Sequence, residues 1–301
     1  MSIHRIAAAT FVLLVSSAPA ALAQANSLFD GLGPRELALG ESMRGEATGA
    51  LATTLNPAGL PLSRELVLES GYGYRPWDGA SVFAISACDS TVPVPGCFYY
   101  RFFTAEPEIS GMSFNHRAHE VGYVAARAIG RFVIGATYRY FDYNSDLEGE
   151  NEGDAAGHSA DLGLTFVGSE ALKLGFVGYN LVSTQDSANY PRAFALGLVL
   201  RPTQTMSLSA DGLWNTDLPE GQSTGRYGGG FEYFIVDSKQ QAGYPLRIGA
   251  VYDNTFDGTY VTGGAGYRSM SVGLDVGVRK QVAGGDELMV IGSVRVFAPN
   301  R

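Results

Sequence analysis

Residues 33–60, GPRELALGESMRGEATGALATTLNPAGL, decide the architecture of this 301-residue chain. They lie between an apolar N-terminal leader and a long series of segments in which every second residue is apolar. The stretch is rich in small residues and closes on Asn56, Pro57, Ala58, Gly59 and Leu60. It follows no strand pattern, yet it carries apolar side chains that need burial, namely Leu37, Leu39, Leu51 and Leu55. The sequence therefore predicts a plug inside the structure that the alternating segments build.

Residues 1–23 have the pattern of a secretory signal peptide. His4 and Arg5 precede an apolar run over residues 6–15, and small residues follow up to Ala23. The run is too short for a spanning helix, and no later segment reaches the roughly 18 to 20 uninterrupted apolar residues that such a helix needs. If this exported chain crosses a membrane, it must cross it with strands.

From residue 65 onward, segments of about ten residues alternate between apolar and small or polar positions, and turn residues separate them. In one segment Phe132 and Ile134 share a face, whereas Val133 and Arg139 share the other. Tight connections alternate with longer polar ones, which is typical of outer-membrane barrels and not of a soluble sandwich. The predicted strands are 65–73, 79–87, 97–104, 118–129, 131–143, 158–167, 171–182, 193–201, 204–215, 225–236, 244–254, 259–268, 270–280 and 286–298.

These features predict an all-β fold, an antiparallel transmembrane β-barrel of about 14 strands with an N-terminal luminal hatch, in the bacterial cell outer membrane. The expected divisions are the signal peptide at 1–23, the hatch at 24–64 and the barrel at 65–301. With the hatch and the C-terminus both periplasmic, the tight turns fall on the periplasmic side as well. The name hatch is kept below for residues 24–64.

The predicted register places charged residues on the inner face of the barrel, at Arg139, Asp161, Lys173, Asp211, Glu232, Arg247, Asp275 and Arg279. Inward glycines lie among them and would let the hatch backbone approach the wall closely, at Gly163, Gly175, Gly228, Gly230, Gly249, Gly273 and Gly277. The wall charges can pair with hatch charges at Arg35, Glu36, Glu41, Arg44 and Glu46. Both a ligand contact and a set of interior ion pairs that hold the plug fit this pattern.

Cys88 and Cys97 are the only cysteines of the chain. They flank Asp-Ser-Thr-Val-Pro-Val-Pro-Gly, a segment whose turn residues can bring the two thiols together. Because the periplasm is oxidising and a metal site would need more ligands nearby, the pair predicts a loop-closing disulfide.

Several function classes are excluded by composition and motif. The net charge is −9 and no cluster of Lys and Arg appears, so we expect no nucleic acid as a partner. No metalloprotease or nucleophile-elbow signature occurs, and the neighbouring His158 and Asp161 do not make a triad, so we expect neither an enzyme nor a cofactor. The acidic run from Asp146 to Asp154 lacks the order of a calcium loop and indicates a solvated outside loop, so we expect no metal there.

The hatch motif, with Pro34-Arg35, then Ala38-Leu39-Gly40, and finally Asn56-Pro57-Ala58-Gly59, resembles the N-terminal hatch of the FadL-type outer-membrane transporters of long-chain fatty acids, a superfamily that includes PorV-type proteins. The resemblance covers about thirty residues and implies a gating role for Asn56, Pro57, Ala58 and Gly59. Pro57 and Gly59 shape a bend there, since proline fixes φ and glycine permits turns. A fixed plug is the alternative. Leu39-Gly40-Glu41-Ser42 departs from the glycine-rich, uncharged stretch that is common in the family.

The resemblance also implies a kinked third strand that opens a lateral exit into the bilayer. The aromatic residues 98–103, followed by Pro107 and Gly111, lie at the matching position and alternate poorly. An aromatic girdle at the membrane interface explains the same residues without an opening.

By this resemblance the chain provides passive passage for hydrophobic small molecules such as long-chain fatty acids. The expected partners are a hydrophobic small-molecule ligand or lipid, together with the outer membrane and its lipopolysaccharide. The alternative is a PorV-type accessory or scaffold barrel with a protein partner at its outside loops, residues 145–157 and 183–192.

Overall fold

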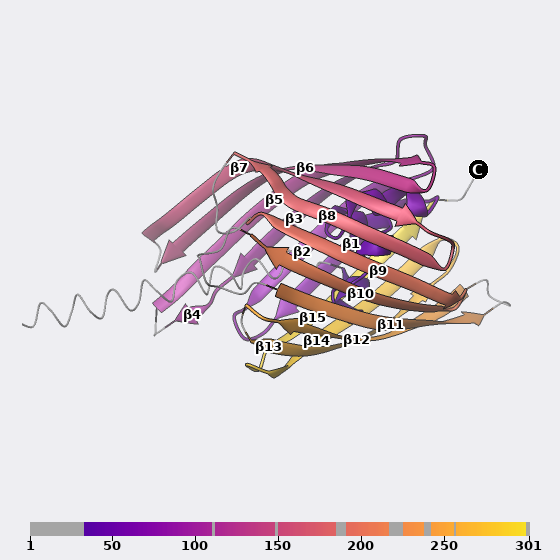
Figure 1. The fold of residues 1–301 in the computed structure, drawn as a ribbon. Coiled ribbons are helices and arrows are strands. Elements are labelled where there is room, and N and C mark those ends of the chain that lie inside the picture. Colours follow the sequence, from indigo (N-terminus) through magenta and orange to yellow (C-terminus); the bar gives the residue numbers. More distant parts are fainter. Residues whose placement is uncertain are drawn as a thin grey trace, which may run out of the picture.

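The computed structural model describes residues 33–109, 112–147, 150–184, 191–216, 225–237, 242–255 and 257–298. Antiparallel strands form one sheet that curves into a barrel (Figure 1). The strands are β1 (Leu66–Arg75), β2 (Ala80–Asp89), β3 (Gly96–Ala105), β4 (Glu108–Ile109), β5 (Met112–Ile129), β6 (Phe132–Leu147), β7 (Glu150–Val167), β8 (Leu172–Ser183), β9 (Ala193–Thr203), β10 (Met206–Asn215), β11 (Gly225–Asp237), β12 (Ala242–Asp253), β13 (Gly258–Arg268), β14 (Val272–Ala283) and β15 (Leu288–Phe297).

The sheet closes on itself. Apart from the short strand β4, successive strands pair along the chain, so that β3 pairs with β5, and β1 pairs with β15. Of the fifteen strands in the described residues, β4 has two residues and pairs only with β5, which leaves fourteen strands in the wall, as predicted. Closure pairs every wall strand on both sides, so no unpaired edge faces lipid.

The outer surface of the wall is apolar. In β6, Phe132 and Ile134 are half exposed, whereas Val133 and Arg139 point inward and are buried. The same alternation holds around the barrel, and its exposed residues form the belt that contacts lipid acyl chains. The closed ladder and this belt make the chain a transmembrane barrel of the bacterial outer membrane, as predicted. Among the described residues, no helix has the length and apolarity to cross a bilayer.

Of the two alternatives for the third strand, a break and an aromatic girdle, the described residues fit the girdle. β3 pairs without a register shift with β2 and with β5, from Gly96 to Ala105. Its outward side chains include Phe98, which is 65% exposed and packs against Tyr123, so the aromatic residues belong to the outer belt. Residue 111 lies outside the described residues. The pairing of β7 with β8 does contain a register shift. Asn180, on β8, has a left-handed φ of 52°.

The strands β5, β6 and β7 are longer than predicted and project beyond the rest of the wall (Figure 1). The segment 145–157, expected to be a loop, belongs largely to this hairpin, because β6 runs to Leu147 and β7 begins at Glu150. The residues added to β6 and β7 are mostly polar and acidic, so the sequence there lacks the apolar alternation on which the prediction depended.

The described part of the hatch, residues 33–64, lies inside the barrel, where Figure 1 shows it as the darkest coils. It contains one short helix, α3 (Pro34–Ala38), and three 3₁₀ turns, η1 (Arg44–Glu46), η2 (Gly49–Thr53) and η3 (Pro57–Leu62). α3 packs against β12 to β15, η1 against β7 to β9, η2 against β2, β3 and β5, and η3 against β5 to β7. The hatch therefore contacts most of the circumference of the wall.

Inward glycines let the hatch backbone touch the wall. A Cβ atom added to Gly228 would lie 1.8 Å from the carbonyl oxygen of Gly40, and one added to Gly249 would lie 2.5 Å from the Gly40 nitrogen. Gly175 lies in the same way against Arg44, and the pattern extends to Gly135, Gly163, Gly197, Gly230, Gly264 and Gly277. Of the predicted inward glycines, Gly273 is the exception, because its neighbours are wall side chains.

We expect Gly228→Ala to destabilise the folded barrel by about 1–3 kcal/mol, because the new methyl group meets backbone that cannot move aside. The measurement is the temperature at which the compact, fast-migrating form is lost on gels. The control is Gly71→Ala, whose Cβ would come no closer than 3.3 Å to its neighbours. Equal melting of the two variants would contradict the close contact between hatch and wall.

Candidate functional site

Ion pairs fasten the hatch to one side of the lumen. All of the hatch groups involved are largely buried, and their partners lie on β8, β9, β10, β11 and β14. The pairs are Arg35–Glu232 (2.8 Å), Glu41–Arg226 (2.7 Å), Glu41–Arg279, Arg44–Asp211 (3.1 Å), Glu46–Lys173 (3.0 Å) and Glu46–Arg201 (2.6 Å). Removing one partner of a buried pair typically costs about 3–5 kcal/mol, so these contacts hold the hatch strongly.

The pKa values of the hatch carboxyl groups depend on whether each group has an ion-pair partner. Burial alone would raise the pKa of Glu41, but Arg226 and Arg279 reverse the effect and lower it below its ordinary value. Glu36 behaves differently, because it forms no ion pair within the described ranges and instead accepts a hydrogen bond from the Gly33 nitrogen at 2.5 Å. Burial, with a smaller contribution from Glu69, raises the pKa of Glu36 to about 7. The predicted pairing of Glu36 with a wall charge is therefore wrong.

The predicted luminal residues divide into two groups. Lys173, Asp211, Glu232 and Arg279 contact the hatch directly, as given above. The other four form ion pairs within the wall. Arg139 pairs with Asp161, and Arg247 pairs with Asp275 and, at 2.6 Å, with Glu232.

Sequence reasoning missed five luminal cations of the described wall, namely Arg75, Arg101, Arg201, Arg226 and Arg295. Arg226 lies on the same face as Gly228 and Glu232, so its position in the alternation could have revealed it. Arg295, which pairs with Asp275, could have been found in the same way. Arg201 lies near the periplasmic end of β9, next to a turn, where the alternation of apolar and polar residues ends.

Asn56 is the central polar residue of the hatch bend. It is fully buried, and its side-chain nitrogen donates to the Arg44 carbonyl at 2.8 Å and to the Thr165 hydroxyl at 3.0 Å. Its side-chain oxygen accepts from the Ala58 nitrogen at 3.0 Å and so caps η3, which begins at Pro57. Asn56 thereby joins two parts of the hatch to β7.

Gly59 serves a different purpose from the one predicted. It does not adopt a left-handed φ, so no turn there demands glycine. A Cβ atom at this position would lie 2.1 Å from the Ala47 carbonyl oxygen. Gly59 is needed because two segments of the hatch touch at this point.

An apolar cluster packs Leu37 of the hatch against the outer part of β2, β3, β5, β6 and β15. It consists of Leu37 from the hatch together with inward side chains of the wall, namely Ala80, Val82, Phe103, Ala105, Ala118, Tyr143, Met289 and Ile291. We call this set the outer cluster. The sequence did not reveal it, because the predicted interior contained only glycines and charges, and an apolar inward residue resembles an outward one when read from pattern alone.

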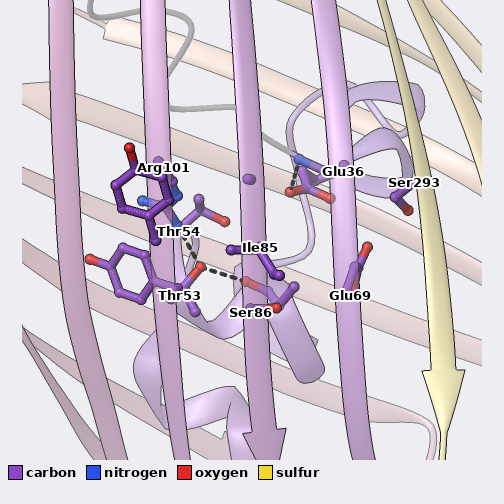
Figure 2. Close-up of a pocket in the computed structure, with 14 residues that line it drawn as sticks. Glu36, Thr53, Thr54, Glu69, Ile85, Ser86, Arg101 and Ser293 are labelled. Carbon is purple, nitrogen blue, oxygen red and sulfur yellow. Dashed lines mark hydrogen bonds between the residues drawn. The ribbon is translucent and has the colours of Figure 1, made fainter.

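Small cavities remain between the hatch and the wall, and described residues line at least two of them. The first is lined by Glu36, Thr53, Glu69, Ser86, Arg101 and Ser293 among others (Figure 2), and offers about 30 Å³ to the centres of water molecules. The second lies beside Glu41 and Arg44 and offers about 10 Å³. These volumes suit about one to three waters, so the structure represents a closed barrel at both places.

Cys88 and Cys97 form a disulfide between β2 and β3 near the periplasmic end of the wall. The pair is buried against Tyr99 and Val124, inside the lumen. Among the described residues, no three His, Cys, Asp or Glu side chains converge as metal ligands, and Glu148 of the acidic run lies outside those residues. His158 hydrogen-bonds the Tyr138 hydroxyl on the outer surface.

Comparison with known proteins identifies the fold. No family model and no curated protein matches the chain. Among solved structures, it is similar to the CymD monoaromatic hydrocarbon channel, at 13% identity and a TM-score of 0.66, over 90% of this chain and 98% of the other. It is also similar to a mutant of the TodX monoaromatic hydrocarbon channel, at 13% identity and a TM-score of 0.68, over 90% and 99%. The resemblance to FadL-type barrels is thus confirmed at the level of the fold.

We expect Glu41→Gln to destabilise the protein by about 3–5 kcal/mol, because it leaves Arg226 and Arg279 buried beside a neutral side chain. The matched control is Glu65→Gln, which breaks the exposed pair with Arg268 and should change stability by about 0–1 kcal/mol. Denaturant unfolding of both purified variants measures the difference. Similar stabilities for the two variants would show that the buried pairs do not hold the hatch.

Proposed function

We propose that this chain provides passive passage for hydrophobic small molecules across the outer membrane and that the hatch closes the route in the state observed. The outer cluster carries the proposal. A barrel for polar solutes needs a hydrated lumen, whereas the outer part of this wall packs Val82, Phe103 and Ile291 into a buried apolar cluster. An apolar solute gains about 25 cal/mol for each Å² that it removes from water on entering such a site. The fold shared with two hydrocarbon channels supports the same proposal.

The proposed mechanism begins where the outer cluster meets the hatch. Leu37 of α3 is fully buried in that cluster, so an entering apolar molecule competes with Leu37 for the same contacts. Displacing Leu37 would shift α3, and the shift would reach the bend at Asn56, Pro57, Ala58 and Gly59 through the hatch backbone. These four residues are the proposed gate.

Backbone strain in the hatch supports a second arrangement. Glu41 and Met43 have φ angles of 58° and 109°, which residues with side chains rarely adopt. Each such residue costs about 1–3 kcal/mol and persists only while its surroundings hold it. Release of the ion pairs around Glu41 would relieve this strain, so the free-energy difference between the closed and open arrangements is smaller than the ion pairs alone suggest.

The chemistry of the outer mouth favours an uncharged ligand. A fatty acid carries a carboxylate that would need a cation at the entry. Arg75, opposite Ala80 of the outer cluster, pairs with Asp78 at 2.5 Å and with Glu287 at 3.7 Å. Because this arginine already contacts two carboxylates, we place neutral hydrocarbons ahead of long-chain fatty acids as the ligand class.

A scaffold barrel is the second candidate function. The projecting part of β5, β6 and β7 supports it, since a raised β-sheet edge beyond the membrane offers a surface for a protein partner or for lipopolysaccharide (Figure 1). In that case the hatch would stay fixed and the lumen would never open.

We expect Ile291→Asn to lower the uptake of labelled toluene severalfold in cells that produce the protein, because the amide must lose its water when an apolar ligand packs against it. The control is Val177→Asn, an equally buried inward position on β8 outside the outer cluster. Parallel uptake of labelled oleate separates the two ligand classes, and oleate should respond less.

Gel migration of the folded form confirms that both variants assemble. If the unmodified protein raises uptake of neither compound above that of cells without it, the channel proposal fails and the scaffold function gains support.

A further inference from the structure

The pairing between β7 and β8 contains a bulge in β8. Ala160 of β7 pairs with Val182, but Leu162 pairs with Gly178. Residues 179–181 of β8 therefore lie opposite Asp161, where a regular ladder would place a single residue. Bulges of this kind are common beside functional sites, because they change where a side chain points.

Side chains hold the bulge in place. The Asn180 nitrogen donates to the Asp161 carboxylate at 2.8 Å, and Asp161 is itself buried and paired with Arg139. The Ser159 hydroxyl donates to the Asn180 side-chain oxygen at 2.7 Å, and the Asn180 side-chain nitrogen donates to the Pro191 carbonyl at 2.9 Å. These contacts replace ladder bonds that the bulge interrupts, since unpaired backbone groups are costly in a membrane wall.

Tyr179, the first residue of the bulge, reaches the hatch. Its hydroxyl donates to the Leu55 carbonyl at 2.5 Å and accepts from the Arg44 Nε atom at 2.8 Å. The Arg44 guanidinium carbon also lies 5.8 Å from the centre of the Tyr179 ring, within the range of a cation–π contact. Leu55 directly precedes Asn56, whose side chain donates to the Arg44 carbonyl. Tyr179 thus contacts the same two parts of the hatch that Asn56 joins.

The hydroxyl is the part of Tyr179 that matters for these contacts. A tyrosine hydroxyl has one proton to donate, and here Leu55 receives it. A phenylalanine would keep the ring packed against Ala193 and Leu213 but would take the hydroxyl away from Leu55 and Arg44. A carbonyl that loses its donor inside a protein is destabilised, so the closed hatch should be sensitive to this one atom.

We propose that Tyr179 is a positioning residue of the gate, and that its contact with Leu55 and Arg44 holds residues 56–59 in the closed arrangement. The inference rests on the proposed function only in taking those residues as the gate. For the bend to open, the Leu55 carbonyl must leave the Tyr179 hydroxyl. Tyr179 pairs with Ala193 of β9 but not with β7, so fewer ladder bonds restrain it than a residue paired on both sides.

Hydrogen exchange of the full mature chain in detergent, read by mass spectrometry on fragments that cover residues 52–62, tests the proposal. In the closed bend the Ala58 and Gly59 amides donate to the side chain and the carbonyl of Asn56, so they exchange when the bend opens. We expect Tyr179→Phe to speed their exchange about five- to tenfold, the effect of one lost hydrogen bond. Fragments from β1 and β15 should keep their exchange rates.

The matched control is Tyr143→Phe. The Tyr143 hydroxyl hydrogen-bonds the His116 ring at 2.8 Å, between two wall strands, so this change should leave exchange at Ala58 and Gly59 unaltered. Equal exchange in the two variants overturns the proposal. Faster exchange spread over β1 and β15 also overturns it, because Tyr179 would then serve the stability of the whole barrel. The readout involves no transport, so its outcome is separate from that of the uptake test.

Asn180→Gly tests the bulge by a second route. Glycine tolerates the left-handed φ of 52° at this position, but it loses the side-chain bonds with Ser159 and Pro191. Tyr179 would then be held less firmly, so the Ala58 and Gly59 amides should exchange severalfold faster. Unchanged exchange in a variant that folds, as judged by gel migration, would mean that the bulge does not position Tyr179 and would contradict the proposal.

Discussion

Direct contact between the hatch backbone and the inner wall is the constraint on which the rest of the structure depends. A lumen ringed by fourteen strands is too narrow for a folded segment unless some wall positions carry no side chain. Gly228 and Gly249 meet Gly40, and Gly175 meets Arg44, at distances that no Cβ atom allows. Because these contacts exclude water, the charged groups beside them must find partners within the protein, and the ion pairs of Glu41 and Arg44 satisfy that requirement.

The inner wall is divided by this arrangement into two unlike sides. Strands β8 to β14 carry most of the charges that anchor the hatch. Strands β1 to β6 and β15 carry the two larger apolar clusters, one toward the outer mouth and one around the disulfide, whereas smaller ones lie on β8 to β10. A hydrophobic ligand would therefore follow the apolar side while the charged side keeps the hatch in place.

The sequence predicted the parts of the fold that alternate. Strand number, register and the inward position of residues such as Asp211 and Arg279 follow from the two-residue period, which the lipid belt enforces. Prediction failed where that constraint is absent. The extension of β6 and β7 consists mostly of polar and acidic residues, the need for Gly59 comes from a contact with Ala47, and the lack of an ion pair at Glu36 depends on which arginines were already paired elsewhere. Such three-dimensional pairings leave no trace in a linear pattern.

Conductance in planar bilayers tests most directly whether the hatch is what closes this barrel. The comparison is between the full mature chain and a version that lacks residues 26–60, with both forms first shown to fold by gel migration. The account predicts low conductance for the full chain and a clear rise when the hatch is removed, because the glycine-lined wall would then face water. Equal conductance of the two forms would contradict it and would mean that the wall closes the lumen without the hatch.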